Sequence, residues 1–177
     1  MIIAFDYGER RIGIAVSDET GKYAIALKYI TNNIPSTSRK SDSRKFQNSD
    51  RIRQNTPSLR SQIRFERQKL FNKMLYYIYC YYPEKIIVGI PKVLDIHTGQ
   101  ITESTQAKAI RRFFNLFNKF LISKNIICPI EYVDETLTSK IALENLQNMN
   151  ASKKNIAENV DSESARILLQ EYLDKLR

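Results

Sequence analysis

The first thirty residues contain three alternating apolar stretches, and this pattern constrains the fold more than any other feature of the chain. Residues 2–6 (IIAFD) are apolar at both alternate sets of positions and end in Asp6, which is typical of a strand buried on both faces. Residues 10–18 (RRIGIAVSD) and 22–30 (KYAIALKYI) alternate again after short turns. Together they predict an antiparallel three-stranded meander.

The remaining chain alternates between helix-like and strand-like patterns. Apolar residues at helical spacing predict one helix that ends before Pro83 and another whose apolar face contains Ala107, Ile110, Phe114, Phe117 and Leu121. Short apolar runs predict strands at 85–91 and 129–135, and two further helices are expected near 138–149 and 161–176. This order predicts an α/β fold: a mixed five-stranded sheet, with a three-stranded antiparallel meander, two parallel strands and helices on both faces.

Three local interpretations accompany this fold. Leu70, Met74, Ile78 and Tyr82 are expected on the buried face of the helix before Pro83. The run YYIYCYY at 76–82 is interpreted as a packed aromatic helix face rather than a base-stacking surface. Residues 92–101 (KVLDIHTGQI) are interpreted as a turn-rich linker.

Positive charge is concentrated in one segment. The chain has 177 residues and a net charge of +9, and residues 34–70 contain ten basic and three acidic side chains, a net +7. Residues 34–65 are poor in apolar side chains and predict a long loop. We therefore expect a single domain over 1–177 with a basic insertion at about 34–70. This insertion is either a polyanion-binding segment or a solvated loop without a partner.

Other classes of protein are disfavoured by what the sequence lacks. No apolar run approaches the roughly 18 to 20 residues that cross a bilayer, and the first residues do not resemble a leader peptide. These features predict a cytoplasmic protein without a membrane partner. Two cysteines, Cys80 and Cys128, are expected to be buried thiols rather than a disulfide or metal site.

Acidic residues stand at the ends of several predicted elements. Asp6 ends the first strand, Asp134 and Glu135 end the last strand, and Asp161 begins the final helix in line with Ala165, Leu168 and Tyr172. Carboxylates brought together repel one another unless a cation lies between them, and oxygen ligands without His or Cys favour Mg²⁺ or Mn²⁺. The competing interpretation is that the acids form turns and helix caps, with Asp161 as an N-cap.

Four motifs, taken in order, resemble one known family. They are FDYGERRIGIAVSD (5–18), IIVGIPKVLDIHTGQITE (86–103), VDETLTS (133–139) and NVDSESARILLQEYL (159–173). The chain resembles the YqgF-type pre-16S rRNA nuclease family, which is also described as Holliday-junction-resolvase-like. The resemblance covers nearly the whole chain except about 34–70, and it implies an RNase H-like fold.

The resemblance also implies roles for individual residues. Asp6, Glu135 and Asp161 would be catalytic metal ligands for Mg²⁺ or Mn²⁺, and Asp134 would be a further catalytic residue. Arg10, Arg11 and Lys92 would bind the phosphates of the nucleic acid. One departure is Thr136, which stands where the family usually has Arg. Either Lys140 or the basic insertion would then supply the missing cation, or the activity would be weaker.

The implied function is a metal-dependent endonuclease that processes the end of pre-16S ribosomal RNA during ribosome biogenesis. Its partners would be structured ribosomal RNA precursor and ribosomal particles, and the protein would be a monomer or a homodimer. Three alternatives remain open. They are a Holliday-junction resolvase, which should be dimeric, a non-catalytic RNA- or ribosome-binding module, and an actin-like ATPase, for which 177 residues leave little room.

Overall fold

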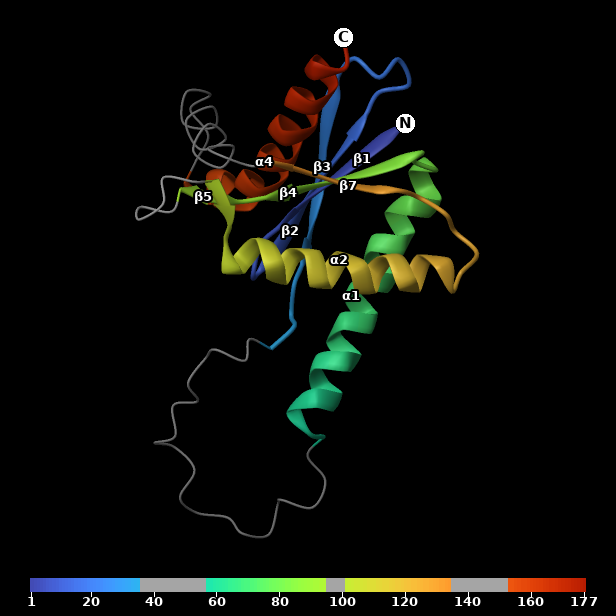
Figure 1. The fold of residues 1–177 in the computed structure, drawn as a ribbon, viewed down its shortest axis with the longest axis vertical. Helices are drawn as coiled ribbons and strands as arrows, with labels where there is room; N and C mark the ends of the chain where they lie inside the picture. Colours follow the sequence, from blue (N-terminus) through green and yellow to red (C-terminus); the bar gives the residue numbers. More distant parts are fainter. Residues whose placement is uncertain (36–56, 95–100, 135–152) are drawn as a thin grey trace.

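The computed structural model describes residues 1–35, 57–94, 101–134 and 153–177 (Figure 1). Its strands are β1 (Ile2–Tyr7), β2 (Arg11–Ser17), β3 (Ala24–Thr31), β4 (Lys85–Ile90), β5 (Lys92–Leu94), β6 (Ile101–Glu103) and β7 (Ile130–Asp134). Its helices are α1 (Leu59–Tyr81), α2 (Thr105–Ile122) and α4 (Lys153–Lys175). The helix expected near 138–149 and most of the basic insertion lie outside the described residues. None of the described helices is long and apolar enough to cross a membrane.

Five strands form one mixed sheet in the order β3-β2-β1-β4-β7. The pairs β1–β2 and β2–β3 are antiparallel, whereas β1–β4 and β4–β7 are parallel. This arrangement confirms the predicted mixed five-stranded sheet, with its three-stranded meander and two parallel strands. The register places Asp6 opposite Gly13 on β2, and Asp134 opposite Ile90 on β4.

Helices cover both faces of the sheet, as predicted (Figure 1). Side chains alternate along a strand, and in β1 the apolar residues divide accordingly. Ile3 and Phe5 join the larger core cluster with α1 and α2, while Ile2 and Ala4 join a second cluster with α4. Both faces of β1 are therefore buried, which explains its continuous apolar sequence.

Helix α2 agrees with its predicted apolar face. The Ser104 hydroxyl caps the helix by accepting a hydrogen bond from the Ala107 amide at 2.9 Å. All five residues expected to face the core are buried: Ala107, Ile110, Phe114, Phe117 and Leu121.

Helix α1 differs from its prediction in two ways. It begins at Leu59, inside the segment expected to be a loop, and Ser58 caps it. Its tyrosines form the expected packed face only in part, because Tyr77 packs against the core, whereas Tyr76 is 64% exposed and Tyr82 is 80% exposed. Tyr82 is the left-handed residue that ends the helix, at φ 42°.

The prediction of two buried thiols was half wrong: Cys128 is buried, whereas Cys80 is exposed.

The segment expected to be a linker contains regular structure at both ends. Lys92–Leu94 (β5) pairs antiparallel with Ile101–Glu103 (β6), so that Lys92 lies opposite Glu103. The linker prediction at 92–101 was therefore wrong for these ends. Strands of only three residues are too short to show an alternating pattern in the sequence. Residues 95–100 lie outside the described residues.

Polar contacts fix α4 on the sheet at its C-terminal half. The Tyr172 hydroxyl donates to a Glu131 carboxylate oxygen at 2.8 Å, and the Lys85 ammonium donates to the same oxygen at 2.9 Å. Lys85 also donates to the Tyr172 hydroxyl at 2.8 Å. These contacts join α4 to both parallel strands, β4 and β7, and so help to set the position of Asp161 further up the helix.

Candidate active site

Asp6 lies near the end of β1 and is half-buried. It continues the alternation of Ile2 and Ala4, whose side chains pack against α4, so its carboxylate belongs to the α4 face of the sheet. Its partner across the strands is Gly13 on β2. Any residue of α4 that packs over Gly13 is therefore a neighbour of Asp6.

Asp161 is that residue. A Cβ added to Gly13 would lie 1.8 Å from the backbone oxygen of Asp161, far inside van der Waals contact. The glycine thus allows the backbone of α4 to lie directly on β2, opposite Asp6. The structure brings Asp6 and Asp161 to one place on one face, although they are distant in sequence.

The surroundings of Asp161 correct one prediction. The helix does not begin there, because α4 starts at Lys153 and Asp161 lies in its interior. Asp161 is therefore not an N-cap, and the reading of this acid as a helix cap alone is wrong. The predicted stripe is confirmed, since Ala165, Leu168 and Tyr172 are all buried.

Arg11 balances the charge beside these acids. Its guanidinium lies 3.5 Å from the Asp161 carboxylate, and both side chains are about one-third exposed. The same guanidinium lies 4.6 Å above the centre of the Tyr29 ring on β3. Arg11 is therefore held between an acid of α4 and an aromatic ring of the sheet.

Asp134 belongs to the other face of the sheet. In β7, Ile130 and Tyr132 pack against the α1 and α2 cluster, whereas Val133 packs against the α4 cluster. Alternation places Asp134 with Tyr132, away from the face of Asp6 and Asp161. The Lys92 ammonium lies 3.5 Å from the Asp134 carboxylate. The next residue, Glu135, lies outside the described residues.

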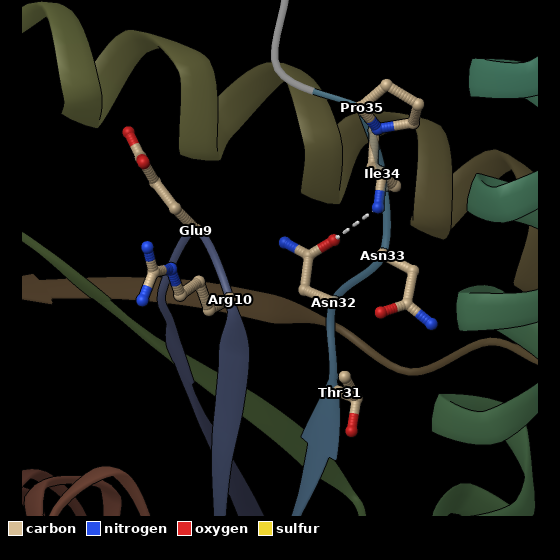
Figure 2. A pocket seen from close by; sticks show the side chains of 7 residues that line it. All are labelled: Glu9, Arg10, Thr31, Asn32, Asn33, Ile34 and Pro35. Atoms are coloured by element: carbon tan, nitrogen blue, oxygen red, sulfur yellow. Dashed lines mark hydrogen bonds between the residues drawn. The ribbon is translucent and has the colours of Figure 1, made fainter. Parts of the chain in front are cut away.

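Arg10 is exposed in the turn between β1 and β2, beside a cavity of about 460 Å³ (Figure 2). The buried residue Asn32 holds this turn, because its amide nitrogen donates to the Gly8 carbonyl at 3.1 Å. The Asn32 backbone N–H also donates to the Arg10 carbonyl at 2.7 Å. The sequence interpretation missed Asn32, whose signal there is a polar residue just after the predicted strand 22–30.

Asn32 also contacts Tyr7, the residue that follows Asp6. Burial raises the pKa of the Tyr7 hydroxyl, and a side-chain hydrogen bond with Asn32 partly opposes that rise. Asn32 therefore anchors both residues that follow Asp6 along the chain, Tyr7 and Gly8.

The donor chemistry around Asp6 fits a hard divalent cation. Asp6 and Asp161 supply carboxylate oxygens, which Mg²⁺ and Mn²⁺ prefer. In the described part of the chain, no three His, Cys, Asp or Glu side chains form a group able to hold a metal ion. The predicted third ligand, Glu135, is not among those residues.

Comparison with known proteins assigns the family. Residues 47–175 match the sequence family described as "RuvX: Holliday junction resolvase". The chain belongs to the RuvX family. This membership confirms the predicted resemblance, and with it the prediction that the chain is a nuclease, a hydrolase of phosphodiester bonds.

Curated relatives of this RuvX family member match over almost its whole length. A protein of Sulfurihydrogenibium sp. named "Putative pre-16S rRNA nuclease" is 31% identical over 176 residues, which are 99% of this chain and 90% of that protein. Proteins with the same name from Burkholderia lata and Chloroflexus aurantiacus are 30% and 27% identical. They cover 99% and 100% of this chain, and 89% and 88% of their own lengths.

Solved structures similar to the RuvX family member include two resolvases. A Fowlpox virus resolvase in complex with Holliday junction DNA is 8% identical with a TM-score of 0.48, covering 99% of this chain and 97% of that one. Thermus thermophilus RuvC in complex with a Holliday junction substrate is 10% identical with a TM-score of 0.46, covering 99% and 94%.

Proposed function

We propose that this protein is a metal-dependent endonuclease that processes the end of the 16S ribosomal RNA precursor. The observation that carries the proposal is the meeting of Asp6 and Asp161 across Gly13 on one face of the sheet. The relatives named as pre-16S rRNA nucleases support the choice of substrate. On this proposal the protein is a single cytoplasmic domain that meets its substrate in ribosomal particles.

The proposed ligands of Mg²⁺ or Mn²⁺ are Asp6, Glu135 and Asp161. When bound, such an ion polarises the phosphodiester and lowers the pKa of the attacking water. The position of Asp134 on the opposite face, with Lys92, supports its exclusion from the ligand set. We assign Asp134 the lesser role of holding Lys92 at the edge of the site.

The protein's own residues bind and orient the substrate. Asp6 and Asp161 are fixed by strand pairing and by helix packing, so their oxygens need little rearrangement when a cation binds. Arg11 lies against Asp161 and is therefore close enough to the carboxylates to contact a phosphate that approaches them. Arg10 is exposed in the turn held by Asn32, and it would bind a phosphate of the RNA backbone away from the scissile bond.

The test compares two substrates and two matched variants. Purified protein would be incubated with Mg²⁺ or Mn²⁺ and either a labelled ribosomal RNA precursor fragment or a four-way DNA junction. We expect Asp6→Asn to lower the cleavage rate at least about 100-fold, because it removes a charged ligand. Asp18→Asn makes the same chemical change in the same motif, at an acid that accepts hydrogen bonds from the Lys22 and Tyr23 backbone amides, and should retain activity.

Each outcome selects one function. Metal-dependent cleavage of the RNA, lost in Asp6→Asn, supports the proposal. Cleavage of the junction alone would replace it with the resolvase function, and a homodimer by sedimentation would accompany that result. Tight RNA binding without cleavage of either substrate would show a non-catalytic binding module. Normal cleavage by folded Asp6→Asn would remove Asp6 from the ligand set.

A further inference from the structure

One stripe of α1 changes from apolar to cationic where the helix leaves the body of the domain. Phe71, Met74 and Ile78 are buried, at spacings of three and four residues. The same spacing continues toward the N-terminus through Arg67, Arg64 and Arg60. The three arginines therefore lie on the same side of α1 as the buried residues Phe71, Met74 and Ile78, but in the N-terminal part of the helix, which lies outside the core.

This cationic part of α1 projects from the domain (Figure 1). No residue of α1 before Leu70 is buried. The first three turns thus bury no side chain fully and add little to the core. A function other than packing is needed to explain why arginine occupies the stripe.

In the described part of the chain, no acidic side chain pairs with these arginines. Glu66 is the acid of this part of the helix, and its carboxylate is paired with Lys69 at 3.0 Å. Among the described residues, neither Arg60, Arg64 nor Arg67 has an acidic partner within 4.0 Å. Seven residues of helix rise about 10 Å, so three positive charges stand in a row over that length.

The opposite side of α1 is less suited to a polyanion. Its cations are Lys69 and Lys73, and Lys69 is already held by Glu66 and by the Phe65 ring, 4.2 Å from its ammonium. Arginine also binds phosphate through a planar fork of donors, which a lysine ammonium does not offer. A protein partner of ordinary interface size would require an apolar centre, whereas this stripe is a row of cations.

We propose that Arg60, Arg64 and Arg67 form a binding surface for the phosphate backbone of the RNA substrate, outside the catalytic centre. The choice of RNA rests on the proposed function, whereas the surface itself rests on the charge and exposure of α1. The stripe holds a segment of RNA beside the domain while the scissile phosphate lies at Asp6.

The experiment compares two double variants of the full-length protein. Arg60→Gln with Arg64→Gln removes two charges from the stripe, and Lys69→Gln with Lys73→Gln removes two from the opposite side of the same helix. All four residues are exposed, and Gln keeps a good helix propensity. Binding of a fluorescein-labelled ribosomal RNA precursor fragment would be measured without divalent metal, over a series of salt concentrations.

We expect the arginine variant to bind the RNA more weakly than the wild type. The slope of log affinity against log salt concentration should become shallower by about 1.4 if the bound segment is single-stranded, or by about 1.8 if it is a duplex. The lysine variant should keep the wild-type slope. Equal slopes in both variants, a larger loss in the lysine variant, or no RNA binding by the wild type would overturn the proposal. Competition by polyglutamate as effective as competition by unlabelled RNA would overturn the assignment to nucleic acid.

This test is separable from that of the catalytic function. A protein that cleaves neither substrate but loses salt dependence in the arginine variant retains the binding surface and loses the proposed activity. A protein that cleaves the RNA with unchanged slopes in both variants retains the activity and loses the surface. Circular dichroism of each variant confirms that α1 is still formed.

Discussion

The Arg11 guanidinium lies 3.5 Å from the Asp161 carboxylate, and this ion pair joins two residues that are 150 positions apart in the chain. The pair stands on the face of the sheet where the backbone of α4 lies over Gly13, the strand partner of Asp6. It places a fixed positive charge beside the carboxylates that we propose as metal ligands. Arg11 and a divalent cation would therefore repel each other while both interact with Asp161.

Arg11→Gln should strengthen metal binding while weakening the apo protein. The side chains of the Arg11–Asp161 ion pair are about one-third exposed, so the pair stabilises the apo protein by on the order of 1 kcal/mol or less. The affinity for the metal should therefore rise by at most about fivefold when Arg11 is removed. We expect the rise in Tm on adding Mn²⁺ to be larger in Arg11→Gln than in the wild type. Arg10→Gln, which neutralises the adjacent exposed cation, is the control. An equal rise in all three proteins would place the metal away from Arg11.

Gly13→Ala should disrupt the site through its backbone. The new methyl group would lie 1.8 Å from the Asp161 carbonyl oxygen, so α4 must move away from β2. We expect a loss of about 1–3 kcal/mol or more in the free energy of unfolding, measured by urea denaturation, together with loss of cleavage. Gly21→Asn is the matched control, because a Cβ at Gly21 meets nothing and Asn tolerates its φ of +67°. A fully stable, active Gly13→Ala would contradict this packing.

Asn32→Ala should loosen the turn that follows Asp6. The Gly8 carbonyl and the Tyr7 hydroxyl would each lose a partner, at a cost of about 1–3 kcal/mol. Because Asn32 orients the turn and does not touch the scissile bond, kcat should fall more than KM rises. A double-mutant cycle with Tyr7→Phe measures the coupling between the two side chains. Additive effects on stability would show that the Tyr7 contact is unimportant.

Glu131→Gln should reveal a pH-dependent contribution of the contacts under α4. Hydrogen bonds from Lys85 and Tyr172 lower the pKa of the Glu131 carboxyl below its ordinary 4.5. Because the pKa of Glu131 is lower in the folded than in the unfolded protein, its charge stabilises the fold above the unfolded-state pKa. This stabilisation is lost as the pH falls through the folded-state pKa. At pH 7 we expect the free energy of unfolding of the wild type to exceed that of Glu131→Gln by less than about 1 kcal/mol, since the Lys85–Glu131 ion pair is partly exposed.

Thermal unfolding of both proteins between pH 7 and pH 3 measures this difference. The gap should narrow as the pH falls below about 4.5, because the wild-type carboxyl then takes up a proton. Glu171→Gln, which changes an acid of α4 outside this cluster, serves as the control. A gap that stays constant over the whole range would show that the charge of Glu131 does not stabilise α4.

The sheet was predictable because its strands carry their own pattern. β1 is apolar at every position that packs, and β2 contains a run of apolar residues that is buried on both faces, so both could be recognised without knowledge of their partners. The start of α1 was not recognised, since Arg60, Arg64 and Arg67 occupy the positions where apolar residues would reveal a helix. Ser58 before Leu59 was the available signal, as a helix N-cap. The tyrosines were misread because a phenol side chain combines an apolar ring with a hydroxyl that tolerates water.

The candidate site was predictable only in part, for a similar reason. Asp6 at a strand end and Asp161 at the head of an apolar stripe could be selected from local pattern. The need for glycine at position 13 depends on the path of α4, which no residue near Gly13 encodes. The pairing of Arg11 with Asp161 and the anchoring of the turn by Asn32 likewise depend on contacts between distant segments.

The seating of α4 on Gly13 also bears on when the enzyme can act during its own synthesis. Chains are made from the N-terminus, so β1 and β2 leave the ribosome long before α4 has been translated. Until residue 161 has emerged and packed over Gly13, Asp6 lacks the second acid that we propose as a metal ligand. On the proposed ligand set, we therefore expect a nascent chain to gain nuclease activity only after α4 has packed, so that the ribosome that makes it is not exposed to the activity during translation.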